Sequence, residues 1–164
     1  MKIYIGTDHA GYVLKQALVT SLKGQGYEVV DMGAFEYNEV DDYPDFVIPV
    51  ARAVSKDPDN VKGIILGGTG EGEAIAANKF PHVRAVVYYG KVNPVVDDEA
   101  DIIVRSREHN NANILSLGAR YFTEESAMEA VDLWLNTSFS EHEKHIRRLG
   151  KIDQINIDKK DKEN

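Results

Sequence analysis

Short strand-like segments alternate with longer helix-like segments along the chain, and this alternation is the strongest constraint on its fold. Strand-like runs occur at residues 2–6, 27–31, 61–66, 83–88 and 114–117. Helix-like segments lie at residues 13–22, 46–54, 73–79 and 124–136. Gly24 and Gly26 are expected to end the first helix, and Pro44 fits the first turn of the second. The pattern predicts an α/β domain with a mostly parallel sheet.

The length of the chain, 164 residues, suits one compact domain with a sizeable core. We expect this domain to span residues 1–152, followed by a charged tail at residues 153–164. The last part of this tail, residues 158–164, has no apolar anchor and is expected to fray. Hydrophobic residues make up 43% and charged residues 28%, which excludes collagen-like, coiled-coil and wholly disordered classes.

The net charge and the absence of cysteine exclude several classes of function. A net charge of -8 argues against binding to nucleic acid or to an anionic membrane, because both partners need a basic face. The chain has no cysteine, which excludes disulfides, thiolate nucleophiles and thiolate metal sites. No apolar run approaches about 18 residues and no leader pattern precedes the first strand, so we expect a cytoplasmic protein.

Asp8 and His9 stand where the first strand ends and the first helix begins. Ligands of open α/β sheets bind beyond the carboxyl ends of the strands, so this pair could bind hydroxyl groups or an anion there. The alternative is that Asp8 only caps the helix and His9 is a surface residue.

Residues 67–72 read GGTGEG and follow the third strand. Glycines at this density allow backbone N–H groups to converge on an oxyanion, although a tight strand-to-helix turn is the simpler explanation. The segment matches neither the dinucleotide-binding motif nor the P-loop.

Glu73 follows this loop and could act as a general base beside an anion-stabilising backbone. It could equally serve only to stabilise the helix dipole. The dipole would lower the pKa of Glu73 and burial would raise it, and the sequence leaves both possible. Glu71 is a competing carboxylate in the same loop.

His109 and Asn110 precede the fifth strand and could supply an acid and a hydrogen-bonding partner, or simply belong to a polar loop. A basic cluster follows near the end of the chain and could bind a phosphate or complement a helix C-terminus. It comprises His142, Lys144, His145, Arg147 and Arg148. The histidines lack metal-ligand spacing, so we expect chemistry without a metal.

Five stretches taken together resemble the ribose-5-phosphate isomerase B family, which also includes galactose-6-phosphate isomerase subunits. They are residues 6–11 (GTDHAG), 42–45 (DYPD), 67–72, 76–79 (AANK) and 107–110 (REHN), and the match runs over residues 1–152. The resemblance implies a Rossmann-like three-layer α/β/α sandwich with a five-stranded parallel sheet in the order 2-1-3-4-5. It also implies a homodimer or tetramer with shared active sites, and aldose–ketose isomerisation of a sugar phosphate without metal or cofactor.

The resemblance also implies roles for individual residues. Many family members carry a cysteine base at the position of Gly67, whereas others have glycine there and a glutamate at the position of Glu73. Glu73 is therefore the expected base, with Thr69, Gly68, Gly70 and Gly72 around the enediolate and His109 opening the sugar ring beside Asn110. Asp8 and Tyr43 would line the sugar, and His9, Arg120, Lys144 and Arg148 would bind the phosphate.

Two departures bear on substrate choice. Lys144 stands where the family has an arginine, and residues 91–104 form a longer segment than is usual there. We expect interconversion of ribose 5-phosphate and ribulose 5-phosphate through an enediolate. The alternatives are isomerisation of allose 6-phosphate or galactose 6-phosphate, a non-catalytic sugar-phosphate-binding module, and a flavodoxin-like FMN or receiver domain.

Overall fold

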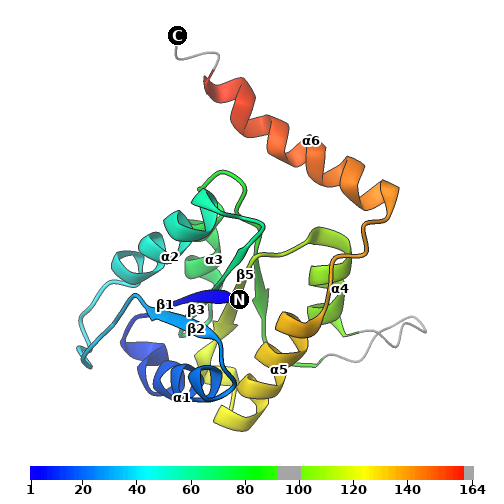
Figure 1. Ribbon diagram of the computed structural model, residues 1–164. Helices are drawn as coiled ribbons and strands as arrows, with labels where there is room; N and C mark the ends of the chain where they lie inside the picture. The colour runs from blue at the N-terminus through cyan, green and yellow to red at the C-terminus, as the bar shows by residue number, and fades with distance from the viewer. Residues whose placement is uncertain (92–100, 161–164) are drawn as a thin grey trace.

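A computed structural model describes residues 1–91 and 101–160, without the side chains of residues 156–160. Five parallel strands form one sheet in the order β2-β1-β3-β5-β4 (Figure 1). The strands are β1 (Lys2–Thr7), β2 (Glu28–Asp31), β3 (Val61–Gly67), β4 (Ala85–Tyr88) and β5 (Ile114–Gly118). The helices are η1 (His9–Gly11), α1 (Tyr12–Gly24), α2 (Pro44–Lys56), α3 (Glu71–Ala77), α4 (Ile102–Asn110), η2 (Ala119–Tyr121), α5 (Glu124–Asn136) and α6 (Glu143–Lys160).

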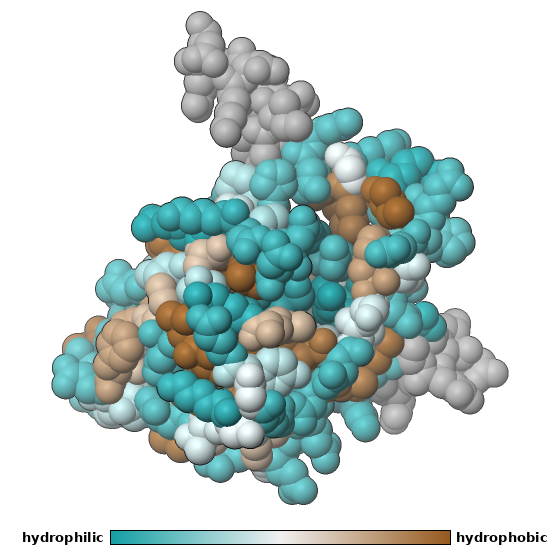
Figure 2. Space-filling view, viewed as in Figure 1, coloured by the Kyte–Doolittle hydropathy of each residue, from teal (hydrophilic) through white to brown (hydrophobic). Residues whose placement is uncertain are grey.

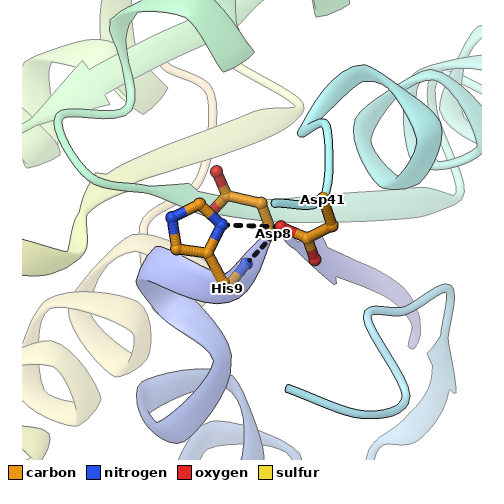
Figure 3. A group of neighbouring side chains, drawn as sticks. All are labelled: Asp8, His9 and Asp41. Carbon is orange, nitrogen blue, oxygen red and sulfur yellow. Dashed lines mark hydrogen bonds and ion pairs between the residues drawn. The ribbon is translucent and has the colours of Figure 1, made fainter. Parts of the chain in front are cut away.

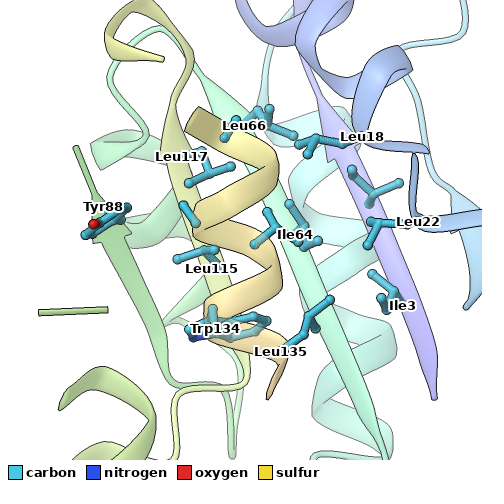
Figure 4. Close-up of a cluster of buried hydrophobic side chains, with 14 of the residues drawn as sticks. Ile3, Leu18, Leu22, Ile64, Leu66, Tyr88, Leu115, Leu117, Trp134 and Leu135 are labelled. Carbon is cyan, nitrogen blue, oxygen red and sulfur yellow. The ribbon is translucent and has the colours of Figure 1, made fainter. Parts of the chain in front are cut away.

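Helices cover both faces of the sheet, which confirms the expected α/β sandwich. Ile64 and Leu66 of β3 face one apolar cluster, and Ile65 faces the other. Figure 4 shows the first cluster, in which Trp134 of α5 lies beside leucines and isoleucines of the central strands. The second cluster is made largely by α2, whose valines pack on β3. Burial on both faces explains why β3 reads as a continuous apolar run.

The expected strand order 2-1-3-4-5 is wrong at one edge. β5 pairs with β3, and β4 lies outside β5 as the edge strand. All residues of β5 are buried, whereas most of β4 is half-buried. Both runs are apolar, and the strand that fits between two neighbours is the one that can bury both faces. The expected pairing of β1 with β3 is confirmed.

Two parts of the C-terminal half differ from the sequence expectations. Residues 107–110 belong to α4 instead of a loop, and α4 is capped by Asp101, whose carboxylate accepts from the Ile103 N–H at 3.1 Å. The helix α6 continues through residue 152 to Lys160, so residues 158–160 of the expected frayed end are helical. The basic cluster lies near the N-terminus of this helix and not at a helix C-terminus. Residues 92–100 of the longer segment, and 161–164, lie outside the described residues.

The helix α6 projects away from the body of the molecule (Figure 1). Three isoleucines among its described side chains are more than half exposed: Ile146 by 53%, Ile152 by 54% and Ile155 by 56%. Figure 2 shows apolar surface, in brown, where this helix leaves the body. Within residues 1–91 and 101–160, no helix has both the length and the apolar character needed to cross a bilayer.

Candidate active site

The carboxyl ends of β1 and β3 bring the first two polar segments into one crevice. The two strands are paired up to Thr7 and Leu66, so Asp8 and the loop after Gly67 leave the sheet side by side. Gly67 is in turn paired with Gly118 at the end of β5. This is the edge at which ligands of parallel sheets bind, as the sequence predicts.

Glu73 turns its carboxyl group back over the end of β3. A Cβ atom built on Gly67 would overlap both the Oε1 and the Cδ of Glu73. The Glu73 carboxyl therefore occupies the space that a side chain at position 67 would need. This geometry explains why the buried position of the Glu73 carboxyl requires glycine at position 67.

Burial decides the direction in which the pKa of Glu73 is shifted. The residue is only 4% exposed, and removal from water raises the pKa of its carboxyl. Its own backbone N–H lowers the pKa, and the nearby Asp8 carboxylate raises it again. Glu71 is exposed and accepts a hydrogen bond from the Tyr89 hydroxyl at 2.5 Å. Of the two carboxylates in this segment, Glu73 is therefore the buried one, and it lies over the end of β3.

The glycine loop is held between two side chains from other parts of the chain. Gly68 lies against the guanidinium of Arg120, and Gly72 lies against the ring of Tyr43, each too close for an added Cβ to fit easily. Gly70 has a left-handed φ of 78°, and the Ser116 hydroxyl donates to its carbonyl at 2.6 Å. Loop, arginine and tyrosine therefore form one wall of the crevice.

Thr69 is exposed, as Glu71 in the same loop is. Its hydroxyl oxygen lies 3.4 Å from the Glu71 N–H, from which it accepts a hydrogen bond. The hydroxyl is thus beside the crevice, and its role toward an enediolate stays a prediction.

Asp8 and His9 meet a third residue, Asp41, from the loop before α2 (Figure 3). Asp8 caps the 3₁₀ turn η1 by accepting from the Ala10 N–H at 3.0 Å, so the capping interpretation is correct for this residue. Burial raises the pKa of Asp8. His9 is bonded to Asp41 through both its backbone N–H and its ring Nδ1. Sequence reasoning missed Asp41, which stands in a polar loop without any periodic pattern.

Asp8, His9 and Asp41 could also offer one ligand atom each to a metal ion, because these atoms lie within 4.8 Å of one another. The Nδ1 of His9 and the Oδ1 of Asp41 are 2.6 Å apart, however, which is the length of a direct hydrogen bond. The arrangement is therefore that of a histidine–carboxylate pair with a second carboxylate beside it.

The other expected site residues lie elsewhere. His109 and Asn110 end α4, four residues before β5 begins, so they lie at the amino edge of the sheet. The crevice lies at the opposite edge, about 13 Å away along β5. The ring of His109 is 4.3 Å from the ring of His145, which is buried and bonded to Ser140 at 2.8 Å. Lys144 and Arg148 are exposed on α6.

The chain matches the family model described as "Ribose/Galactose Isomerase" over residues 3–152. It belongs to this family. Ribose-5-phosphate isomerase B of Mycolicibacterium paratuberculosis is 40% identical over 149 residues, covering 91% of this chain and 87% of the relative. The Escherichia coli protein of the same name is 37% identical over 155 residues, covering 93% and 97%.

Solved structures of the family have the same fold. A ribose-5-phosphate isomerase B from Mycoplasma genitalium with bound ribulose-5-phosphate has a TM-score of 0.86 and 35% identity, covering 94% of this chain and 95% of its own. The Clostridium thermocellum protein has a TM-score of 0.84 and 44% identity, covering 96% and 99%.

Proposed function

We propose that this protein is an aldose–ketose isomerase that interconverts ribose 5-phosphate and ribulose 5-phosphate. The observation that carries the proposal is the buried Glu73 carboxyl lying over Gly67, beside a glycine-rich backbone at the ligand-binding edge of the sheet. Relatives named ribose-5-phosphate isomerase B, one of them solved with ribulose-5-phosphate bound, support the choice of a pentose.

The reaction needs one base that serves two carbons. The Glu73 carboxylate removes the proton from C2 of the open-chain aldose and returns it to C1 after the enediolate has formed. The raised pKa of Glu73 brings the base closer to the working pH, which favours both transfers. Backbone N–H groups at Gly68, Gly70 and Gly72, with the Thr69 hydroxyl, would stabilise the charge on the enediolate oxygens. Asp8 and Tyr43 would hold the sugar.

The active form is proposed to be a homodimer, or a tetramer of such dimers, in which each site uses two copies of the chain. The placement of His109 and Asn110 at the amino edge of the sheet supports this, because a single chain keeps them away from Glu73. The projecting helix α6, with its exposed isoleucines, offers the apolar surface that a second copy would cover. Light scattering of the purified protein would give the number of copies.

In such a dimer, His109 of one copy would protonate the ring oxygen of a sugar bound in the crevice of the other. Lys144 and Arg148 would reach the phosphate from the same side as His109, and His9 and Arg120 would meet it from the crevice side. Lysine presents a point charge where arginine would bind two oxygens, so phosphate binding here relies more on the remaining residues.

A turnover panel on chelator-treated protein tests the proposal. It compares ribose 5-phosphate with allose 6-phosphate and galactose 6-phosphate, and we expect the pentose to give the highest kcat/KM. A preference for either hexose would keep the reaction and change the substrate. Binding of all three without turnover would overturn the proposal in favour of a non-catalytic module.

The cytoplasmic location and the absence of nucleic-acid and membrane partners stay predictions. The net charge of -8 supports the absence of nucleic-acid and anionic-membrane partners, since it leaves no general excess of basic side chains for polyanions. Fractionation of cells that express the chain would test the location.

A further inference from the structure

The carboxylate of Asp41 binds His9 at two points. The same oxygen, Oδ1, accepts from the His9 backbone N–H at 3.0 Å and contacts the ring Nδ1 at 2.6 Å (Figure 3). The Asp41 side chain is 8% exposed and that of His9 is 30% exposed. Two bonds to one residue fix both the backbone at the end of β1 and the direction of the imidazole ring.

The loop that carries Asp41 is anchored by buried contacts to the same end of the sheet. Lys15 is fully buried, and its ammonium donates to both oxygens of Asp31, at 2.6 and 2.7 Å, and to the Ala34 carbonyl at 2.7 Å. The Ala34 N–H donates to the Thr7 carbonyl at 2.7 Å. The beginning of the loop is therefore tied to β1, directly before Asp8 and His9. The loop thus starts beside the segment that carries His9, and Asp41 near its other end contacts that residue.

We propose that Asp41 is a positioning residue, which keeps the proton on Nδ1 of His9 and holds the imidazole as a cation for the phosphate of the substrate. This inference rests on the proposed function and adds a residue to it. With Nδ1 bonded to Asp41, the ring meets a ligand through Nε2. Nε2 can donate to a phosphate oxygen only when the imidazole is charged, because the neutral ring would then carry its single proton on Nδ1.

The charges around His9 favour the cation on balance. The hydrogen bond to Asp41 raises the pKa of His9, and partial burial of the ring lowers it. The neighbouring carboxylate of Asp8 raises the pKa, and the guanidinium of Arg120 lowers it. The edge-on ring of Tyr37, with centroids 6.4 Å apart, completes the surroundings. Two carboxylates and one guanidinium thus face the imidazole.

The test removes the negative charge of Asp41 and keeps the shape of the side chain. In Asp41→Asn the amide oxygen can still accept from His9, but the anion is lost. Imidazole signals are followed by NMR as a function of pH, with His9→Gln used to assign the His9 signal. We expect Asp41→Asn to lower the pKa of His9, whereas Asp42→Asn, a matched change of the exposed neighbour, leaves it unchanged.

Kinetics then show whether this charge acts on the substrate. For Asp41→Asn we expect the KM for ribose 5-phosphate to rise about tenfold at pH 8, the size of one charge-assisted contact, with kcat little changed. At pH 6, below the ordinary histidine pKa of about 6.5, the increase should be smaller, because more of the variant's imidazole is protonated there than at pH 8. Asp41→Glu, which restores the anion, should recover part of the loss.

Three results would overturn the inference. One is a His9 signal that titrates below its ordinary pKa of about 6.5 in the unaltered protein, a measurement that does not depend on how any variant folds. Another is an Asp41→Asn protein with unchanged His9 titration. The third is a KM increase that is equal at pH 6 and pH 8, which a purely structural role would produce.

Failure of the proposed function gives a different result. If the unaltered protein does not turn over ribose 5-phosphate, the binding constant for that sugar replaces KM in the same comparison, and the NMR titration is unaffected. Weaker binding by Asp41→Asn at pH 8 but not at pH 6 would support the role of Asp41 in a non-catalytic protein. Equal binding by both proteins would overturn it.

Discussion

The crevice at the carboxyl edge of the sheet and the histidine cluster at its amino edge are built in opposite ways. In the crevice, Glu73 and Asp8 are almost fully buried, and their positions are fixed by the ends of paired strands. At the amino edge, His109 packs against His145 between two helices, and the nearby Lys144 and Arg148 are exposed. The proposed base, Glu73, is therefore positioned within one chain, and the residues proposed to open the sugar ring and bind the phosphate lie on an outer surface.

The largest effect is expected from removing the base in the crevice. Glu73→Gln keeps the shape and hydrogen-bonding capacity of the side chain but removes its ability to take a proton. Steady-state kinetics should show kcat lowered about 10²- to 10⁴-fold, with substrate binding largely kept. Glu71→Gln is the matched control, since this carboxylate is exposed and bonded to Tyr89, and its kcat should stay near normal. Near-normal turnover by Glu73→Gln would assign the base to another residue.

A smaller loss is expected from filling the space beneath that carboxyl. The methyl group of Gly67→Ala would overlap the Glu73 carboxyl, so the base must move aside. Misplacement by about 1 Å can cost roughly 10²-fold in rate, and we expect a loss of that size in kcat. Gly24→Ala is the control, because nothing lies within 4 Å of the added carbon there. Full activity of Gly67→Ala would mean that Glu73 does not act from this position.

The two regions also differ in how far the sequence could predict them. Asp8 and the glycine loop follow strands whose apolar patterns are strong, and neighbouring parallel strands end at one edge, so the crevice could be located. Asp41 could not be found in this way, because its contact with His9 joins residues 32 apart and no local pattern encodes it. The base was named through the resemblance, and the structure adds that its carboxyl fills the side-chain space of Gly67.

The wrong expectations for the helix α6 and for the order of β4 and β5 have a common cause. An apolar residue recurs every three positions in α6 from Ile146 to Ile155, but the isoleucines described there are exposed in the single chain. This apolar stripe therefore does not mark a helix that packs on its own domain. The order of β4 and β5 depends on which strand is buried on both faces, and two short apolar runs do not reveal that. Contacts between distant parts of the chain decide the strand order, and we propose that a second copy of the chain covers the exposed face of α6.

Mixing two inactive variants would test the separation of the two regions directly. Glu73→Gln damages the crevice, and His109→Asn damages the amino edge. If each site uses both regions from different chains, random re-association makes half of the dimers hybrid, each with one intact site, and restores about a quarter of normal activity. Each variant refolded alone is the control and should stay near background. A mixture that also stays at background would place both groups in one chain and would contradict the shared site.

The smallest expected effect is on the stability of the fold. Its dependence on pH has opposite signs at Glu73 in the crevice and at His145 at the amino edge. The pKa of Glu73 is raised in the folded protein, so the folded state binds its proton more tightly than the unfolded state does. Stability is therefore lost as the pH rises from the ordinary glutamate pKa through the raised value, and the cost persists at neutral pH. Glu73→Gln removes this cost, and we expect its Tm to exceed that of the unaltered protein by about 2 °C at pH 7. The two Tm values should converge near pH 4.

His145 provides the contrast. Burial, followed by the charge of its neighbours, lowers the pKa of His145, so the unfolded state binds its proton more tightly. Stability from this region is present above the ordinary histidine pKa and is lost as the pH falls through it. Thermal melts of Glu73→Gln and His145→Gln from pH 4 to pH 8 would separate the two contributions. If Glu73→Gln melted below the unaltered protein at pH 7, the buried carboxylate would be a stabilising group. The geometry around Glu73 would then depend on this charge, and the charge would not destabilise the fold.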